Sequence, residues 1–118
     1  MQITSLNHFS FDVSDLDKSI RFYETFLGMT LLNRSFRDPE FSSKATGICN
    51  VILEIAYLKT TNCKLELIKY LTEDGKVGGE TKPMAKLAHL CLNVQQLLSF
   101  YETHKNTIEF VNEPLQIP

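Results

Sequence analysis

Two histidines occupy matching places in a repeated stretch of the sequence and could together bind a metal ion. His8 lies in LNHFSFDV and His89 in LAHLCLNV, and each is the third residue of a segment that ends in valine. A copy of FYET follows each segment, at residues 22–25 and 100–103. If the two copies pair about a pseudo-twofold axis, the imidazoles approach each other, and imidazole is a good ligand for first-row divalent metals.

A carboxylate would complete a three-ligand site with positions left open for a substrate. Glu66, in KLELIKY, is the better candidate, because a carboxylate between two leucines of a strand is costly unless it is exposed or paired. Glu54, in VILEIAYL, is the competitor, since it is also set among apolar residues. Each residue has a purely structural alternative: a hydrogen-bonded histidine within a strand, or a solvated carboxylate on an edge strand.

Composition limits the class of protein and its partners. The chain has 118 residues, 43% of them hydrophobic and 22% charged, which is typical of one globular domain. The net charge of −2, without a basic run, argues against binding to nucleic acid or to a membrane surface. No apolar run is long enough to span a bilayer, and the N-terminus does not resemble a signal peptide. Three cysteines without CxxC spacing predict reduced thiols, and we expect a cytoplasmic protein.

The first half of the chain predicts a strand, a helix and three further strands. Apolar residues alternate with polar ones at the start, and His8 falls on the less apolar face. Ser14 is placed to cap the following helix, and Gly28 to end it. Residues 38–48, DPEFSSKATGI, read as a polar loop. The predicted strands are residues 6–13, 29–37, 50–59 and 63–71, and the predicted helix is residues 15–27.

The pattern then restarts after a glycine-rich, charged linker. The second half predicts a strand at residues 87–94, a helix at 95–105 and a strand at 107–111. The repeat therefore indicates a duplicated β-α-β module, continued by two more strands in the first copy only.

The quoted motifs resemble one known family. LNHFSFDVSDLDKSIRFYETFLGMTLL is similar to the opening module of the vicinal oxygen chelate superfamily, which includes glyoxalase I, methylmalonyl-CoA epimerase, extradiol dioxygenases and the bleomycin-resistance proteins. KLELIKY resembles the family's fourth strand, and LAHLCLNV the strand that opens its second module. The resemblance implies an α+β fold of paired β-α-β-β-β modules, with the second module reduced to β-α-β. We expect one domain over residues 1–118, with module one at about 1–72, a linker at 73–84 and module two at 85–118.

The resemblance also implies a site and a function. His8, Glu66 and His89 match the family's metal ligands, Glu66 would be the catalytic carboxylate, and Zn, Ni, Mn, Fe and Co all suit such ligands. The family's fourth ligand, on its last strand, has no counterpart here. The resemblance implies a divalent-metal-dependent lyase or isomerase acting on a small substrate that chelates the metal through oxygens. The alternatives are a metal-free small-molecule-binding protein of the bleomycin-resistance type, or an inactive relative. Because unpaired sheet edges favour pairing between chains, we also expect a homodimer.

Overall fold

The computed structural model of the chain describes residues 1–72 and 90–116. The chain divides into two compact units, Met1–Pro83 and Met84–Pro118, which are described separately below. The fold is mixed α+β, which confirms the expected fold class. The predicted linker and the first part of the predicted strand at 87–94 lie outside the described residues, and residues 90–94 contain no strand.

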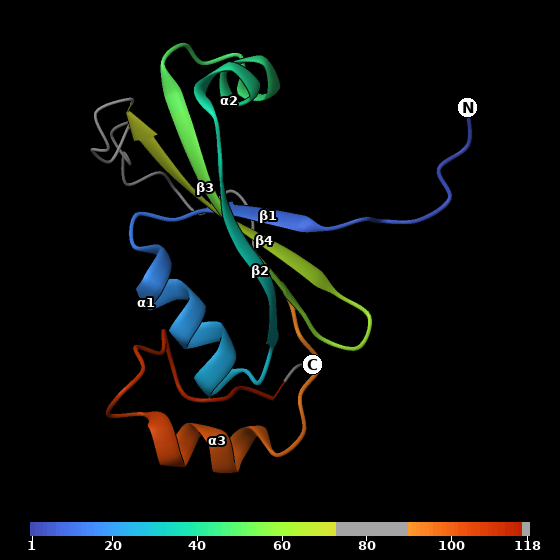
Figure 1. Cartoon of the computed structure of the whole chain (residues 1–118). Coiled ribbons are helices and arrows are strands. Elements are labelled where there is room, and N and C mark those ends of the chain that lie inside the picture. Colours follow the sequence, from blue (N-terminus) through green and yellow to red (C-terminus); the bar gives the residue numbers. More distant parts are fainter. Residues whose placement is uncertain (73–89, 117–118) are drawn as a thin grey trace. The chain divides into compact units, whose positions relative to one another are not determined.

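The first unit is built on a four-stranded sheet with the order β1-β4-β3-β2 (Figure 1). Its strands are β1 (Phe9–Asp12), β2 (Thr30–Arg37), β3 (Val51–Lys59) and β4 (Lys64–Thr72). β1 runs parallel to β4, whereas β3 is antiparallel to both β4 and β2. β1 is shorter than the predicted strand at 6–13, so His8 lies immediately before it.

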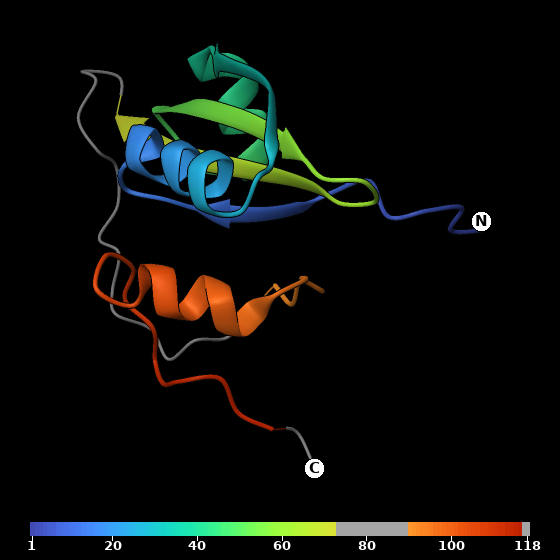
Figure 2. The ribbon, with the colours of Figure 1, turned by 90° about the horizontal axis from the view of Figure 1, so that it is seen from below.

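The two faces of this sheet carry different residues because side chains alternate along each strand. One face packs against α1 (Leu16–Arg21), which lies alongside the sheet (Figure 2). The buried apolar residues on this side include Leu16, Ile20, Ala56, Leu58, Leu65, Leu67 and Leu71. The opposite face carries a second set of residues from β3 and β4, and these line the pocket described below. That set is Leu53, Ile55, Tyr57, Glu66, Ile68 and Tyr70.

The start of α1 differs from its prediction by one residue. Asp15, rather than Ser14, caps the helix, and its side chain accepts a 3.0 Å hydrogen bond from the backbone N–H of Lys18. The first FYET copy then forms a π-helical turn, η1 (Phe22–Phe26). Gly28 follows with a positive φ of 66°, as its predicted place at the helix end requires.

The predicted loop at residues 38–48 is wrong, because most of it forms the helix α2 (Pro39–Thr46). Asp38 caps this helix through a 2.8 Å hydrogen bond from the N–H of Phe41. Pro39 occupies the first turn, where its missing N–H costs nothing, and Gly47 ends the helix with a φ of 74°. The proline and the glycine that suggested a loop are therefore the start and stop signals of a helix.

The second unit contains the predicted second helix, α3 (Leu97–His104), but not the strand predicted after it. The backbone N–H groups of Thr107 and Ile108 both donate to the carbonyl of His104 and so fold the chain back at the helix end. Phe110 then packs edge-on against Tyr101, with ring centroids 5.1 Å apart. Residues 107–111 therefore fold back onto the C-terminal end of α3 instead of forming a strand. No helix within residues 1–72 and 90–116 is long and apolar enough to cross a membrane.

Ser42 fastens α2 to the sheet, and its removal should destabilise the first unit. This fully buried side chain donates to the carbonyl of Arg37 at 3.1 Å and accepts from the N–H of Leu53 at 3.3 Å. We expect Ser42→Ala to lower the free energy of unfolding by about 1–3 kcal/mol, because buried backbone groups lose their partner. Urea unfolding checks this, and Ser43→Ala on the same helix is the control. Equal effects of the two substitutions would contradict the assigned role.

Candidate functional site

Glu66 is a buried carboxylate held by side chains from the two neighbouring strands. Only 7% of the residue is exposed. Its Oε1 accepts a 2.9 Å hydrogen bond from the Ser10 hydroxyl of β1, and its Oε2 accepts one from the Tyr57 hydroxyl of β3. Ser10 and Tyr57 are the residues directly opposite Glu66 in the two strand pairings. The register of β1 and β3 against β4 therefore creates this environment.

His8 is the second candidate ligand that lies at this point. Its Nε2 is 3.5 Å from Glu66 Oε1, and its ring meets Tyr57 edge-on with centroids 5.6 Å apart. Its Nδ1 lies 2.7 Å from Asn7 Oδ1. In the tautomer that carries its proton on Nδ1, Nε2 has the lone pair that can bind a ligand.

The spacing of these two donor atoms is compatible with a shared metal ion. Two ligand bonds of about 2.1 Å at a tetrahedral angle place their donor atoms roughly 3.4 Å apart. The observed separation of His8 Nε2 and Glu66 Oε1 is 3.5 Å. The Asn7 contact at Nδ1 is also the kind of outer partner that orients a metal-binding histidine.

Glu54, the competing carboxylate, lies on the opposite face of the sheet. Arg34 of β2 binds it with Nε and Nη2, at 2.7 and 2.6 Å from Glu54 Oε1. The same guanidinium reaches Asp17 of α1 at 2.5 Å and holds the pKa of that carboxyl below its usual value. Glu54 thus belongs to an ion-pair bridge between α1 and the sheet, and Glu66 is the carboxylate near His8.

The third predicted ligand, His89, lies outside the described residues. Within residues 1–72 and 90–116, no three His, Cys, Asp or Glu side chains come close enough together to hold a metal ion. The structure therefore brings together His8 and Glu66, and the complete three-ligand site stays a prediction.

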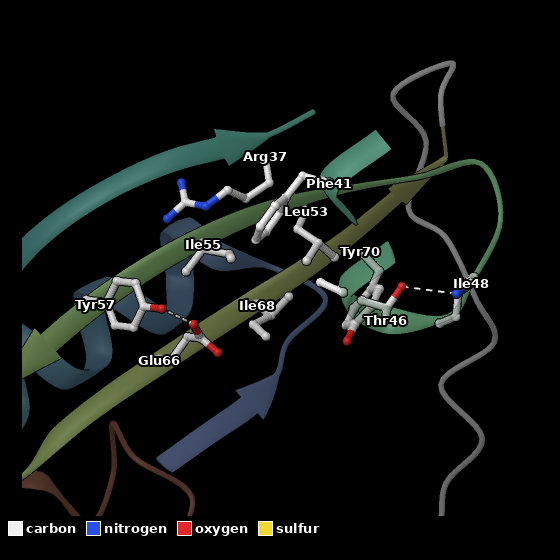
Figure 3. A pocket seen from close by; sticks show the side chains of 11 residues that line it. Arg37, Phe41, Thr46, Ile48, Leu53, Ile55, Tyr57, Glu66, Ile68 and Tyr70 are labelled. Atoms are coloured by element: carbon white, nitrogen blue, oxygen red, sulfur yellow. Dashed lines mark hydrogen bonds between the residues drawn. The ribbon is translucent and has the colours of Figure 1, made fainter. Parts of the chain in front are cut away.

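A pocket of about 430 Å³ opens on the same face of the sheet (Figure 3). Its floor comes from β3 and β4, and α2 with the residues after it forms one wall. Figure 3 shows Tyr57 and Glu66 joined at one end and Thr46 and Ile48 at the other. The lining residues are Arg37, Phe41, Ala45, Thr46, Ile48, Leu53, Ile55, Tyr57, Glu66, Ile68 and Tyr70.

Two titratable neighbours of Glu66 were not identified from the sequence. Burial, followed by the hydrogen bond and negative charge of Glu66, raises the pKa of Tyr57 to about 12. Burial and the nearby Glu66 charge also raise the pKa of Asp12. Asp12 shares the strand parity of His8 and Ser10, so the alternation in LNHFSFDV could have placed it on this face. Tyr57 could have been found only by pairing the two strands in register.

Comparisons with known proteins identify the fold and the family. A family model described as the Glyoxalase/Bleomycin resistance protein/Dioxygenase superfamily matches residues 5–116. Among solved structures, the chain is similar to a glyoxalase family protein from Bacillus cereus, with a TM-score of 0.80 and 22% sequence identity. That match covers 100% of this chain and 82% of the other, and at this identity it shows the fold alone. A comparison with curated proteins gives no significant match.

Alkaline titration tests the contact between Tyr57 and Glu66. We expect the difference in phenolate absorbance between the wild type and Tyr57→Phe to report a pKa of about 12. In Glu66→Gln this pKa should fall towards the ordinary value near 10, because the acceptor carboxylate and its charge are removed. A Tyr57 pKa unchanged by Glu66→Gln would contradict the contact.

The raised pKa of Tyr57 also predicts how the stability of the folded chain changes at alkaline pH. The unfolded chain loses the Tyr57 proton near pH 10, before the folded chain does, so this contribution to stability is complete below pH 10. It is lost as the pH rises to about 12. Denaturant unfolding should therefore show a smaller alkaline loss of stability in Tyr57→Phe than in the wild type.

Proposed function

The chain belongs to the glyoxalase/bleomycin resistance protein/dioxygenase superfamily, and on this premise we propose that it is a divalent-metal-dependent enzyme of the glyoxalase or epimerase type. Its reaction would be a lyase or isomerase step on a small substrate that presents two neighbouring oxygens. The observation that carries the proposal is the 3.5 Å separation of His8 Nε2 and Glu66 Oε1 beside the pocket.

We assign the metal ligands to His8, Glu66 and His89. His8 would offer a neutral Nε2 and Glu66 a negative oxygen, a donor set that suits Zn, Ni, Mn, Fe or Co. We add His89 as the third ligand because its sequence segment matches the family motif that carries a metal-binding histidine. When bound, the metal supplies Lewis acidity to the substrate oxygens.

Glu66 is also the group that we assign to proton transfer. It is the carboxylate among the residues that line the pocket, so it can accept a proton from a bound substrate. Ser10 and Tyr57 hold its two oxygens in place from opposite sides. Because the pKa of Tyr57 is about 12, its hydroxyl keeps its proton at neutral pH and remains a donor to Glu66.

A metal-free binding protein is the second candidate function. The observation that favours it is that both Glu66 oxygens already accept hydrogen bonds within the protein. A carboxylate satisfied in this way needs no metal to offset its burial. In this case the pocket would bind a small molecule without transforming it.

Metal analysis separates the two functions. After dialysis against Zn, Ni, Mn or Co salts, we expect the wild type to retain about one ion per chain. Glu66→Gln should lose this ion, because an amide is a poor substitute for a charged ligand. Glu54→Gln is the matched control, since Glu54 is equally buried but lies on the other face, where Arg34 binds it, and this variant should retain the metal.

The remaining outcomes of the metal analysis are also decisive. His89→Ala should reduce metal retention as strongly as His8→Ala if His89 is the third ligand. Equal metal retention by the wild type, Glu66→Gln and His8→Ala would remove the proposed site. Absence of metal from the wild type, together with tight binding of a small molecule, would favour the binding protein.

We also propose a homodimer. β1 and β2 are the outer strands of the four-stranded sheet, so each has one edge without a strand partner within the described residues. Phe36, on β2, is 64% exposed and adds apolar surface at that edge. Such edges favour pairing between chains. Sedimentation at micromolar concentration should give about twice the chain mass of 13.5 kDa, and a monomer would contradict the proposal.

A cytoplasmic location is part of the same proposal. Cys49, Cys63 and Cys91 are all free, and two of them are exposed. Free thiols persist most readily in a reducing compartment. The free thiols therefore support a reducing compartment, which is what a cytoplasmic location provides.

A further inference from the structure

Arg37 places a positive charge at the pocket without a carboxylate partner among the described residues. It lies at the end of β2 and lines the pocket, and its guanidinium points over the sheet towards Tyr57 (Figure 3). Its Nη1 donates to the Ser35 hydroxyl at 2.5 Å, a neutral acceptor. By contrast, Arg34 on the other face of the same strand has both Asp17 and Glu54. Arg37 is therefore available to bind an anion that enters the pocket.

We propose that the pocket binds a small carboxylate-bearing molecule, with Arg37 as the residue that recognises the carboxylate. This proposal rests on the proposed function in taking the pocket as the substrate site. A guanidinium matches a planar carboxylate with two parallel N–H···O bonds. Because Arg37 is one positive charge and Glu66 and Asp12 lie on the same face of the sheet, a monoanion is favoured over a phosphate dianion.

The strand register determines how far the carboxylate lies from the candidate metal ligands. Ser35, which Arg37 contacts, is opposite Ile55 in β3, and Ile55 is opposite Ile68 in β4. Glu66 is the next residue along that face of β4. Two strand spacings, about 10 Å, separate the backbones of β2 and β4, and the Arg37 side chain extends over part of that width towards Tyr57 (Figure 3). A ligand that contacts both Arg37 and Glu66 therefore lies across β3, with its body between its carboxylate and its reacting oxygens.

The surface between the two ends determines the character of that body. Ile55, Ile68 and Tyr70 belong to the floor, and Phe41 of α2 stands at the wall. Phe41 is 51% exposed, so its ring offers free apolar surface to a ligand. The body of the ligand should therefore be apolar, and a flat or aromatic group would gain most from the rings.

The experiment measures binding of 4-phenylbutyrate and of its uncharged amide by calorimetry, with a chelator present. The wild type should bind the acid at least about tenfold more tightly than the amide, because only the carboxylate can form charge-assisted hydrogen bonds with Arg37. Arg37→Gln should abolish this preference, and Arg37→Lys should keep part of it. Arg21→Gln removes the same charge from the exposed side of α1 and should bind as the wild type does.

Equal binding of acid and amide by the wild type, or an acid preference that survives Arg37→Gln, would overturn the proposal. Tighter binding of inorganic phosphate than of the acid would overturn the assignment to a carboxylate. Because a chelator is present, this calorimetry measures carboxylate binding independently of any metal ion. A carboxylate preference in a protein that retains no metal would refute the proposed enzyme but not this inference. A metal site without that preference refutes this inference alone.

Discussion

The burial of the Glu66 carboxylate is the constraint that shapes the candidate site. Its neighbours along β4, Leu65 and Leu67, are fully buried against the α1 side, so the intervening side chain must point to the other face. A buried carboxylate without hydrogen bonds would cost several kcal/mol. Ser10 and Tyr57, on the two adjacent strands, offset this cost by donating hydrogen bonds to the carboxylate. A shift of one residue in β1 would bring Phe9 or Phe11 to this point, so the parallel register of the edge strand is itself fixed by Glu66.

The sheet solves the same problem differently on its other face. Glu54 is as buried as Glu66, but its partner is the guanidinium of Arg34, which also holds Asp17 of α1. That arrangement gives both carboxylates a positive partner and ties a helix to the sheet. Glu66 instead has neutral donors and a histidine, so its negative charge is not cancelled by a fixed cation. Two glutamates in similar sequence settings thus lie in different surroundings: Glu54 joins a helix to the sheet, and Glu66 lies at the candidate site.

Separating these two glutamates from the sequence requires the exact length of the turn between β3 and β4, and the predicted strands at 50–59 and 63–71 make that turn one residue too short. The four residues between β3 and β4 close with a 2.9 Å hydrogen bond from the N–H of Thr60 to the carbonyl of Cys63. This turn aligns Lys59 with Lys64, and counting outward places Tyr57 opposite Glu66 and Lys69 opposite Glu54. Alternation then assigns the glutamates to opposite faces. Which face carries the helix follows only from packing, because α1 could cover either side.

Other elements show where sequence patterns are ambiguous. The strands at β2, β3 and β4 were predictable because their apolar residues follow the period of a half-buried or buried strand. Residues 38–48 were misinterpreted because Pro39 and Gly47 are found both in loops and at helix ends, and the deciding Asp38 cap depends on three-dimensional geometry. Residues 107–111 have strand-forming composition, yet Phe110 gains more by covering the rings of α3.

The position of the candidate ligands within the sheet sets a condition on any complete metal site. His8 precedes an outer strand, and its side chain is 32% exposed, whereas Glu66 is enclosed by β1 and β3. The pair is therefore covered by the sheet on one side and open on the other. Structural zinc sites need four ligands and catalytic ones three, and residues 1–72 bring two candidate donors together at this point. A complete site would therefore need at least one further donor beyond His8 and Glu66, and that donor would have to reach the open side of the pair.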